Sequence, residues 1–198
     1  MNFLNNQLFK QALTHRSWVN ENNDNLGTNE RLEFLGDAIL EFVVSKAIYT
    51  KFPNEEEGYL TALRANLVNT KNLAMVATKL GIGKMILLSK GEEDGGGREN
   101  TSLLADTVEA IIGAMFLDQG IDASEKFIQE NILIDVDKKA SLPLKDPKSL
   151  LQEKVQAKGL PAPKYQVISE FGPDHNKEFT VEVILNGKAE AKGAGKSK

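Results

Sequence analysis

The sequence predicts two domains, an all-α domain followed by a small α+β domain of order α-β-β-β. Apolar residues recur at helical spacing up to about residue 133, whereas later segments alternate apolar and polar side chains as strands do. Between the two patterns, DVDKKASLPLKDP (135–147) contains two prolines and mixed charge, which is typical of a linker. The charge balance also changes, because residues 1–139 hold 14 Lys and Arg against 21 Asp and Glu, and residues 140–198 hold 10 Lys against 7 acidic residues.

The first domain is predicted to consist of helices joined by short breaker segments. The helical pattern covers residues 5–17, 29–50, 58–80, 102–117 and 122–133. FPN at 52–54 and GEEDGGGREN at 91–100 interrupt it. We expect the glycine run in the second breaker to be a flexible loop rather than a phosphate-binding loop, because no GK[ST] follows it.

The second domain is predicted to begin with a helix and to continue as strands. PKSLLQEKVQAKG (147–159) has helical spacing and ends at a glycine. YQVISEF (165–171) and EFTVEVILNG (178–187) alternate like strands, and GPDHNK between them is typical of a hairpin loop. This order predicts an α+β domain.

The composition restricts the possible classes of protein and of metal site. With 198 residues, 41% hydrophobic and 26% charged, the chain has the composition of a globular protein. No apolar run approaches the roughly 18 residues of a membrane span, and the N-terminal residues do not resemble a signal peptide, so we expect a cytoplasmic protein without a membrane partner. The absence of cysteine excludes disulfides and thiolate ligands, and two histidines leave little for zinc. Any bound metal would be held by oxygen.

An acidic stripe marks the predicted helix NERLEFLGDAILEF (29–42). At about 100° per residue, its four acids fall within an arc of roughly 80°; they are Glu30, Glu33, Asp37 and Glu41. The opposite, apolar face is formed by Leu35, Ile39, Phe42 and Val43. A solvated helix face normally mixes charges of both signs, whereas this stripe contains no base. The pattern therefore indicates the wall of a cleft that contains a compensating cation.

A second acid pair occurs in TSLLADTVEAIIGAMF (101–116). Asp106 and Glu109 share a helix face with Ala110 and Gly113, whose small side chains allow another helix to approach closely. If the two acidic faces meet, four carboxylates form one cluster: Glu33, Asp37, Asp106 and Glu109. Such a cluster requires cations, and ligands that are all oxygen suit Mg²⁺ or Mn²⁺.

Two kinds of metal chemistry fit carboxylate clusters on helices. A pair of Mg²⁺ ions is one solution for phosphodiester hydrolysis. A di-iron carboxylate bundle is the alternative, but it requires Glu-x-x-His pairs, and neither His15 nor His175 lies in an acidic helix. The sequence therefore favours phosphodiester hydrolysis.

The motifs resemble those of a known family. NERLEFLGDAILE followed by LADTVEAIIGA resembles the two acidic signatures of bacterial ribonuclease III, and ALTHRSW (12–18) resembles a short motif near that family's N-terminus. The resemblance implies an all-α endonuclease domain at 1–136, a linker at 137–145 and a double-stranded RNA binding domain at 146–198. It implies Mg²⁺-dependent hydrolysis of double-stranded RNA, in which Mn²⁺ can substitute, leaving 5′-phosphate and 3′-hydroxyl ends. It further implies a role in processing rRNA, mRNA and small RNA.

The resemblance also assigns roles to residues of the first domain. The metal ligands would be Glu33, Asp37, Asp106 and Glu109. Asp37 and Glu109 would also be catalytic, and Glu30 would be an auxiliary acid of the cleft. Phe34 corresponds to an aromatic residue that family members insert into a socket on the partner subunit. This implies a homodimer with two active sites, one for each RNA strand.

The second domain resembles a double-stranded RNA binding domain in three segments: SLLQEKVQAKG, FGPDHNKEFTVEV and GAGKSK. Gln152 and Gln156 would meet one minor groove and His175 the next, while Lys196 and Lys198 would face the phosphates between them. The pattern stops where the last helix would begin, so we expect a domain that is incomplete at its C-terminal end, with that helix missing. The alternative function is a non-catalytic RNA-binding or assembly protein on the same fold, which would tolerate loss of the acids, yet all four are present.

Overall fold

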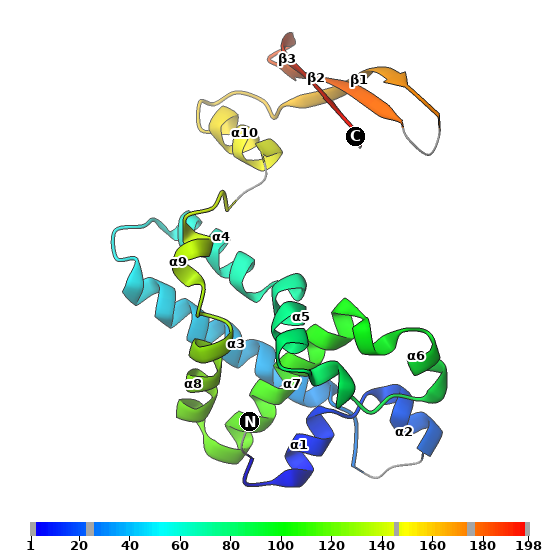
Figure 1. The fold of residues 1–198 in the computed structure, drawn as a ribbon. Helices are drawn as coiled ribbons and strands as arrows, with labels where there is room; N and C mark the ends of the chain where they lie inside the picture. The colour runs from blue at the N-terminus through cyan, green and yellow to red at the C-terminus, as the bar shows by residue number, and fades with distance from the viewer. Residues whose placement is uncertain (1–2, 23–25, 145–146, 174–176, 197–198) are drawn as a thin grey trace. The chain divides into compact units, whose positions relative to one another are not determined.

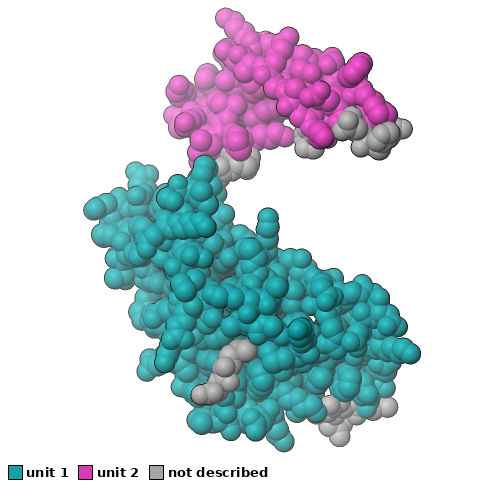
Figure 2. Space-filling view, viewed as in Figure 1, with its two compact units in different colours: residues 1–144 teal, residues 145–198 magenta. Residues whose placement is uncertain are grey.

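The computed structural model describes residues 3–22, 26–144, 147–173 and 177–196. The chain forms two compact units, residues 1–144 and residues 145–198 (Figure 2). Helices make up the first unit, and the second combines one helix with an antiparallel sheet (Figure 1). The fold class predicted from the sequence is therefore confirmed. Among the described residues we find no helix that combines the length and the apolar character needed for a bilayer span.

The first unit contains nine α-helices and two 3₁₀ turns in its described residues. In chain order they are α1 (Asn6–Ala12), α2 (Arg16–Asn22), α3 (Glu30–Lys51), α4 (Glu57–Val68), α5 (Thr70–Lys79), η1 (Ile82–Lys84), α6 (Lys90–Asp94), η2 (Gly97–Glu99), α7 (Thr101–Gln119), α8 (Ile121–Asn131) and α9 (Val136–Ala140).

The centre of the first unit is the pair α3 and α7, which have the most extensive contact of any two elements (Figure 1). Two glycines allow the close approach. A Cβ atom on Gly36 would collide with the backbone carbonyl oxygen of Glu109, and one on Gly113 would collide with that of Leu32. The close approach predicted from Gly113 is therefore confirmed. It places the acid-bearing turns of the two helices next to each other.

The apolar side chains of the first unit form one continuous core. Ile39 and Val43 are buried in it, as the pattern of α3 predicts, and α7 contributes the largest buried stretch. The prediction is wrong for Phe42, whose side chain is 58% exposed. The pattern of α3 alone places Phe42 on the apolar face, but it does not show which neighbours cover that face; Phe42 lines a surface groove with residues of α4.

Two helices predicted as continuous are interrupted. The pattern at 5–17 is divided between α1 and α2, because Leu13–His15 pair with Leu87: the Leu87 amide donates to the Leu13 oxygen (2.8 Å) and the His15 amide to the Leu87 oxygen (3.1 Å). The pattern at 58–80 is divided at Asn69, whose extended backbone ends α4. The Asn69 side chain then accepts from the Asn72 amide and caps α5 (2.9 Å).

The breaker segment 91–100, whose glycine run at 95–97 was predicted as a flexible loop, contains most of α6 and all of η2. Arg98 fixes it to the rest of the unit. Its guanidinium donates to the carbonyl oxygens of Gly83 (2.9 Å) and Ile86 (3.1 Å) and pairs with Glu93 (2.6 Å). The breaker residues therefore form an anchored turn.

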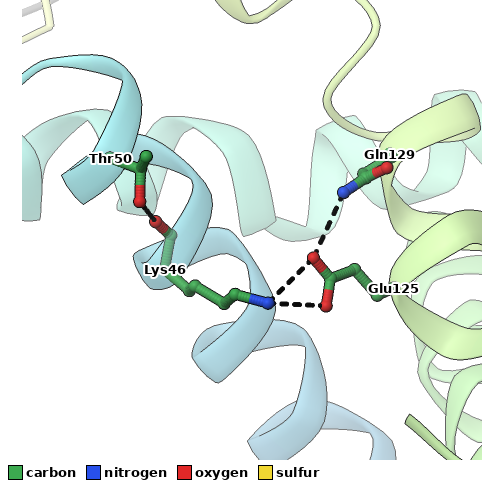
Figure 3. Close-up of polar contacts among 4 residues, drawn as sticks. All are labelled: Lys46, Thr50, Glu125 and Gln129. Atoms are coloured by element: carbon green, nitrogen blue, oxygen red, sulfur yellow. Dashed lines mark hydrogen bonds and ion pairs between the residues drawn. The ribbon is translucent and has the colours of Figure 1, made fainter. Parts of the chain in front are cut away.

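Polar contacts connect α8 to α3 (Figure 3). Lys46 Nζ on α3 donates to both carboxylate oxygens of Glu125 on α8, at 3.1 and 2.9 Å. Gln129 donates to the same carboxylate (3.2 Å), and the Thr50 hydroxyl donates to the Lys46 carbonyl (3.0 Å). These contacts hold the C-terminal half of α3, which also forms one wall of a surface groove described below.

The second unit has the order α10 (Pro147–Gln156), β1 (Lys164–Phe171), β2 (Glu178–Leu185) and β3 (Lys188–Gly195). The three strands form one antiparallel sheet in chain order, with Val167 opposite Val181 and Val181 opposite Gly193. Asn186 and Gly187 both have positive φ, 48° and 80°, which is the geometry of a two-residue type I′ hairpin turn. This turn sets the register of β2 and β3.

Candidate active site

Three carboxylates from α3 and α7 converge in the first unit. Glu33 lies on the first turn of α3, and Asp106 and Glu109 lie one turn apart on α7. Carboxylate oxygens of the three lie within 4.8 Å of one another, and all three side chains are partly buried. Their meeting follows from the contact at Gly36 and Gly113, since each glycine lies within one turn of an acid. We refer to Glu33, Asp106 and Glu109 as the carboxylate cluster.

The carboxylate cluster is under electrostatic strain. Burial, followed by the charges of Asp37, Asp106 and Glu33, raises the pKa of Glu109 to about 8. Burial and then the charge of Asp106 raise the pKa of Glu33, and burial raises the pKa of Asp106. Ionised carboxylates this close repel one another, and a bound cation removes the repulsion. Perturbed acids gathered in one cleft are typical of a functional site.

The other acids of the α3 stripe lie differently. Asp37 is exposed, and its carboxylate does not join the close group, although its charge raises the pKa of both Glu109 and Glu33. Glu41 pairs with Arg64 of α4 at 2.8 Å. The stripe itself contains no base, and for Glu41 the compensating cation comes from another helix.

Glu30 also lies outside the carboxylate cluster. Its side chain accepts a hydrogen bond from the Thr28 hydroxyl (2.9 Å) and faces the Arg16 guanidinium at 3.9 Å. These contacts place Glu30 at the rim of the cleft. Its own partners are therefore a hydroxyl and a base rather than the other acids.

A cavity of about 450 Å³ opens beside the carboxylate cluster. Its lining includes Glu33 and Asp106 together with Glu30, His15, Arg16 and Thr107. The sequence alone favours a structural role for His15 over a ligand role and indicates no role for Arg16. Their only signal was the motif ALTHRSW, and nothing in its residue types shows that the fold brings it to the acids.

The ligands available in this cleft suit a hard divalent cation. The carboxylate cluster offers only oxygen atoms, which are the ligands that Mg²⁺ and Mn²⁺ prefer. Asp37 lies one helical turn after Glu33 and adds a further, exposed acid on the same helix face. The donor set therefore fits the metal predicted from the sequence.

Comparison with known proteins identifies the family. A family model described as Ribonuclease-III-like matches residues 5–136, and the double-stranded RNA binding motif matches residues 147–198. Ribonuclease 3 of Geobacillus kaustophilus is 48% identical over 197 residues, which cover 99% of this chain and 80% of the relative. Ribonuclease 3 of Staphylococcus aureus is 46% identical, with 99% and 81% covered. The chain belongs to the ribonuclease III family.

Solved structures agree with this assignment. The nuclease domain of ribonuclease III from Campylobacter jejuni matches with a TM-score of 0.61 and 42% identity, covering 67% of this chain and 92% of that one. Dicer from Pichia stipitis matches with a TM-score of 0.53 and 25% identity, covering 100% of this chain and 89% of that one. Ribonuclease III enzymes are endoribonucleases of double-stranded RNA. The family and the enzyme class predicted from the sequence are confirmed.

The remaining predicted ribonuclease III residues lie on the surface. Phe34 is 81% exposed on α3. Gln152 and Gln156 are exposed one turn apart on α10, and Lys196 is exposed directly after β3. His175 and Lys198 lie outside the described residues.

Proposed function

We propose that the first unit hydrolyses double-stranded RNA with two Mg²⁺ ions held by Glu33, Asp37, Asp106 and Glu109, and that Mn²⁺ can substitute. The products would carry 5′-phosphate and 3′-hydroxyl ends. The observation that supports this most directly is the carboxylate cluster, whose oxygens lie within 4.8 Å of one another while burial and neighbouring charge raise the pKa of Glu109 to about 8. A cation removes that repulsion, so the cluster is arranged to bind one.

The role proposed for each acid follows from how far its side chain is buried. Paired divalent ions, when bound, activate water and stabilise charge on the phosphate. Glu109, the acid with the largest shift, would bind metal in place of its proton. Asp37 is exposed and would act on the side where RNA approaches. Glu30, which is bonded to Thr28, would shape the rim and contribute less to the reaction.

We further propose a homodimer formed through the exposed side of α3. Phe34, Phe42 and Tyr49 are 81%, 58% and 74% exposed, and at about 100° per residue they fall within roughly 80° of one another on this helix. Phe42 and Tyr49 also line a groove of about 650 Å³ with Leu60 of α4. Exposed aromatic side chains beside a groove are typical of an interface. One of the Campylobacter jejuni nuclease-domain structures is described by a flexible region involved in dimer formation.

The second unit would hold the RNA. Gln152 and Gln156 present amides from one exposed face of α10, as minor-groove contacts require. Lys196, together with His175 and Lys198, would extend the contact to the next groove and to the phosphates. Residues 140–198 carry more basic than acidic side chains, which favours attraction to RNA. Together the units would process rRNA, mRNA and small RNA precursors, with residues 1–136, 137–145 and 146–198 as nuclease domain, linker and RNA-binding domain.

The test is cleavage of a long RNA duplex with and without Mg²⁺, followed by analysis of the product ends. Glu109→Gln should abolish cleavage while leaving RNA binding intact, because it removes a ligand's charge without changing its size. Glu130→Gln is the matched control on α8, where the acid is exposed and faces Lys126 at 4.0 Å. Glu30→Gln should reduce the rate less than Glu109→Gln.

Two further measurements address the metal and the dimer. Ca²⁺ should support RNA binding without efficient cleavage, because it prefers longer bonds and looser geometry than Mg²⁺. Phe34→Ala should shift the dimer toward monomer in sedimentation at low concentration, at a cost of about 3 kcal/mol or more if the ring is buried by the partner. Near wild-type cleavage by Glu109→Gln would contradict the metal site, whereas absence of cleavage by the wild type in Mg²⁺ would favour a non-catalytic RNA-binding or assembly role. An unchanged sedimentation profile would contradict the role of Phe34.

A further inference from the structure

The backbone around His15 is fixed from two directions. It is paired with Leu87 as described above, and the Asn29 amide donates to the Thr14 carbonyl at 2.9 Å. Asn29 directly precedes α3, so the segment is attached to the turn that carries Glu33. His15 is therefore held at a defined place beside the carboxylate cluster.

Hydrogen bonds also define how the imidazole of His15 is protonated. Nδ1 accepts from the Ser17 amide (3.3 Å) and lies 2.8 Å from the Ser17 hydroxyl. That hydroxyl already accepts from the Ser89 amide (3.0 Å), so its own proton is free to point at Nδ1. Since Nδ1 is an acceptor from both groups, the neutral ring carries its proton on Nε2.

With Nδ1 bonded to Ser17, Nε2 is the ring nitrogen left to bond another group. His15 lines the same cavity as Glu33 and Asp106. Burial lowers the pKa of His15, which favours the neutral imidazole. A neutral donor here can hold a carboxylate oxygen without the positive charge that would repel a metal ion.

We propose that His15 is a positioning residue, which donates from Nε2–H to the carboxylate cluster and orients Asp106 for the divalent ion. This inference rests on the proposed metal site. Ligating carboxylates are themselves held by hydrogen bonds, and loss of such a bond typically lowers metal affinity about 10- to 100-fold. The Ser17 hydroxyl bonds to Nδ1 of His15, and the Ser89 amide bonds to that hydroxyl, so Ser17 and Ser89 fix the tautomer of His15.

Two amide substitutions separate this role from simple packing. The side-chain nitrogen of glutamine reaches about as far as Nε2, so His15→Gln keeps a donor toward Asp106. The side-chain amide of asparagine ends near the place of Nδ1, so His15→Asn keeps a polar group near Ser17 but has no donor toward the acids. A packing role predicts similar losses for both, whereas a positioning role predicts a difference.

The experiment titrates Mn²⁺ into the RNA-free full chain and follows the free ion by electron paramagnetic resonance. His15→Asn should weaken Mn²⁺ binding about tenfold or more, while His15→Gln should stay close to wild type. Cleavage by His15→Asn should need more Mg²⁺ and recover toward the wild-type rate at high Mg²⁺. Wild-type Mn²⁺ affinity in His15→Asn, or equal losses in both variants, would overturn the proposal.

Two more variants keep the test decisive. Asp106→Asn should lose Mn²⁺ affinity whatever His15 does. If it binds Mn²⁺ as tightly as wild type, the metal site itself is wrong, whereas loss in Asp106→Asn with none in His15→Asn overturns only the role of His15.

If thermal melting shows that His15→Asn does not fold, Ser17→Ala replaces it. This change removes the hydroxyl donor and leaves Nδ1 only the longer bond from the residue 17 amide, so the tautomer is less firmly fixed and Mn²⁺ affinity should fall; unchanged affinity would contradict the proposal.

Discussion

The first unit buries its apolar side chains in one continuous core that extends from α1 to α9, whereas Val155 is the single buried apolar side chain among the described residues of the second unit. The strands of the second unit keep their apolar residues only partly covered, and Phe171 is 82% exposed. Small units bury a smaller fraction of their surface and have less stability to lose. The two units therefore suit different tasks.

The difference matches what each unit has to do. Metal ligands must be held in a fixed arrangement, and the carboxylate cluster lies on the two helices with the most extensive contact in the structure. Recognition of duplex RNA uses an exposed surface of amides and bases, which does not require a deep core. Changes in the core should therefore affect the chemistry of the first unit, and surface changes should affect RNA capture by the second.

The largest expected effect comes from the contact between α3 and α7. Gly113→Val should destabilise the first unit by at least about 3 kcal/mol, because its new side chain meets the backbone carbonyl of Leu32. Chemical denaturation followed by NMR would show early loss of first-unit signals, with signals of β1–β3 unchanged. Gly58→Ala on α4 is the matched control, since a Cβ there meets nothing and should be neutral or slightly stabilising. Equal stability of the two variants would contradict this account of the core.

The sequence predicted the parts of this contact that depend on local pattern. The periodicity of α3 and α7 showed an acidic face on each helix, and Gly113 indicated that another helix could approach closely, but the meeting of the two acidic faces remained a condition. The pattern did not show the break at Leu13–His15, because that break depends on Leu87, far along the chain. For the same reason it could not pair Glu41 with Arg64 or place His15 in the cleft. Helical periodicity shows which face of one helix is apolar, but not which neighbours cover it.

The second expected effect is a difference in amide hydrogen exchange. Amides of α7 should exchange orders of magnitude more slowly than those of β1 and β2, because opening α7 exposes the core of the first unit. The strands open at a lower free energy, since their side chains are only partly covered. Equal protection of β1, β2 and α7 would show that the second unit is as stable as the first. Side-chain burial would then not predict the relative stability of the two units.

A smaller effect is expected for RNA capture. Gln152→Ala and Gln156→Ala together should raise the Kd for duplex RNA about tenfold, which corresponds to losing about 1.4 kcal/mol of polar contact. Cleavage at saturating RNA should remain unchanged, because the carboxylate cluster lies in the other unit. Gln166→Ala on β1 is the matched control, as Gln166 is also an exposed amide of the second unit. A fall in the saturated rate would show that the two tasks are not separate.

The smallest expected effect is a dependence of stability on pH that belongs to the first unit alone. Glu109 has a pKa of about 8 in the folded chain against an ordinary value of 4.5, so between these values the folded state keeps a proton that the unfolded state releases. Its contribution is therefore fully present below about pH 4.5 and is lost as the pH rises toward 8. Without metal, the melting temperature of the first unit should fall by a few degrees at most between pH 6 and pH 8, since solvent screens the partly exposed acid.

Glu109→Gln should remove most of this slope, because glutamine does not titrate, and it should leave any pH dependence of the second unit unchanged. Added Mg²⁺ should reverse the slope in the wild type, since a proton competes with the ion at low pH and not at pH 8. Differential scanning calorimetry at several pH values, with and without Mg²⁺, measures both effects. A metal-free wild type whose first unit gains stability from pH 6 to pH 8 would contradict the raised pKa. In that case the carboxylates would be ionised without metal, and the strain that supports the metal site would be absent.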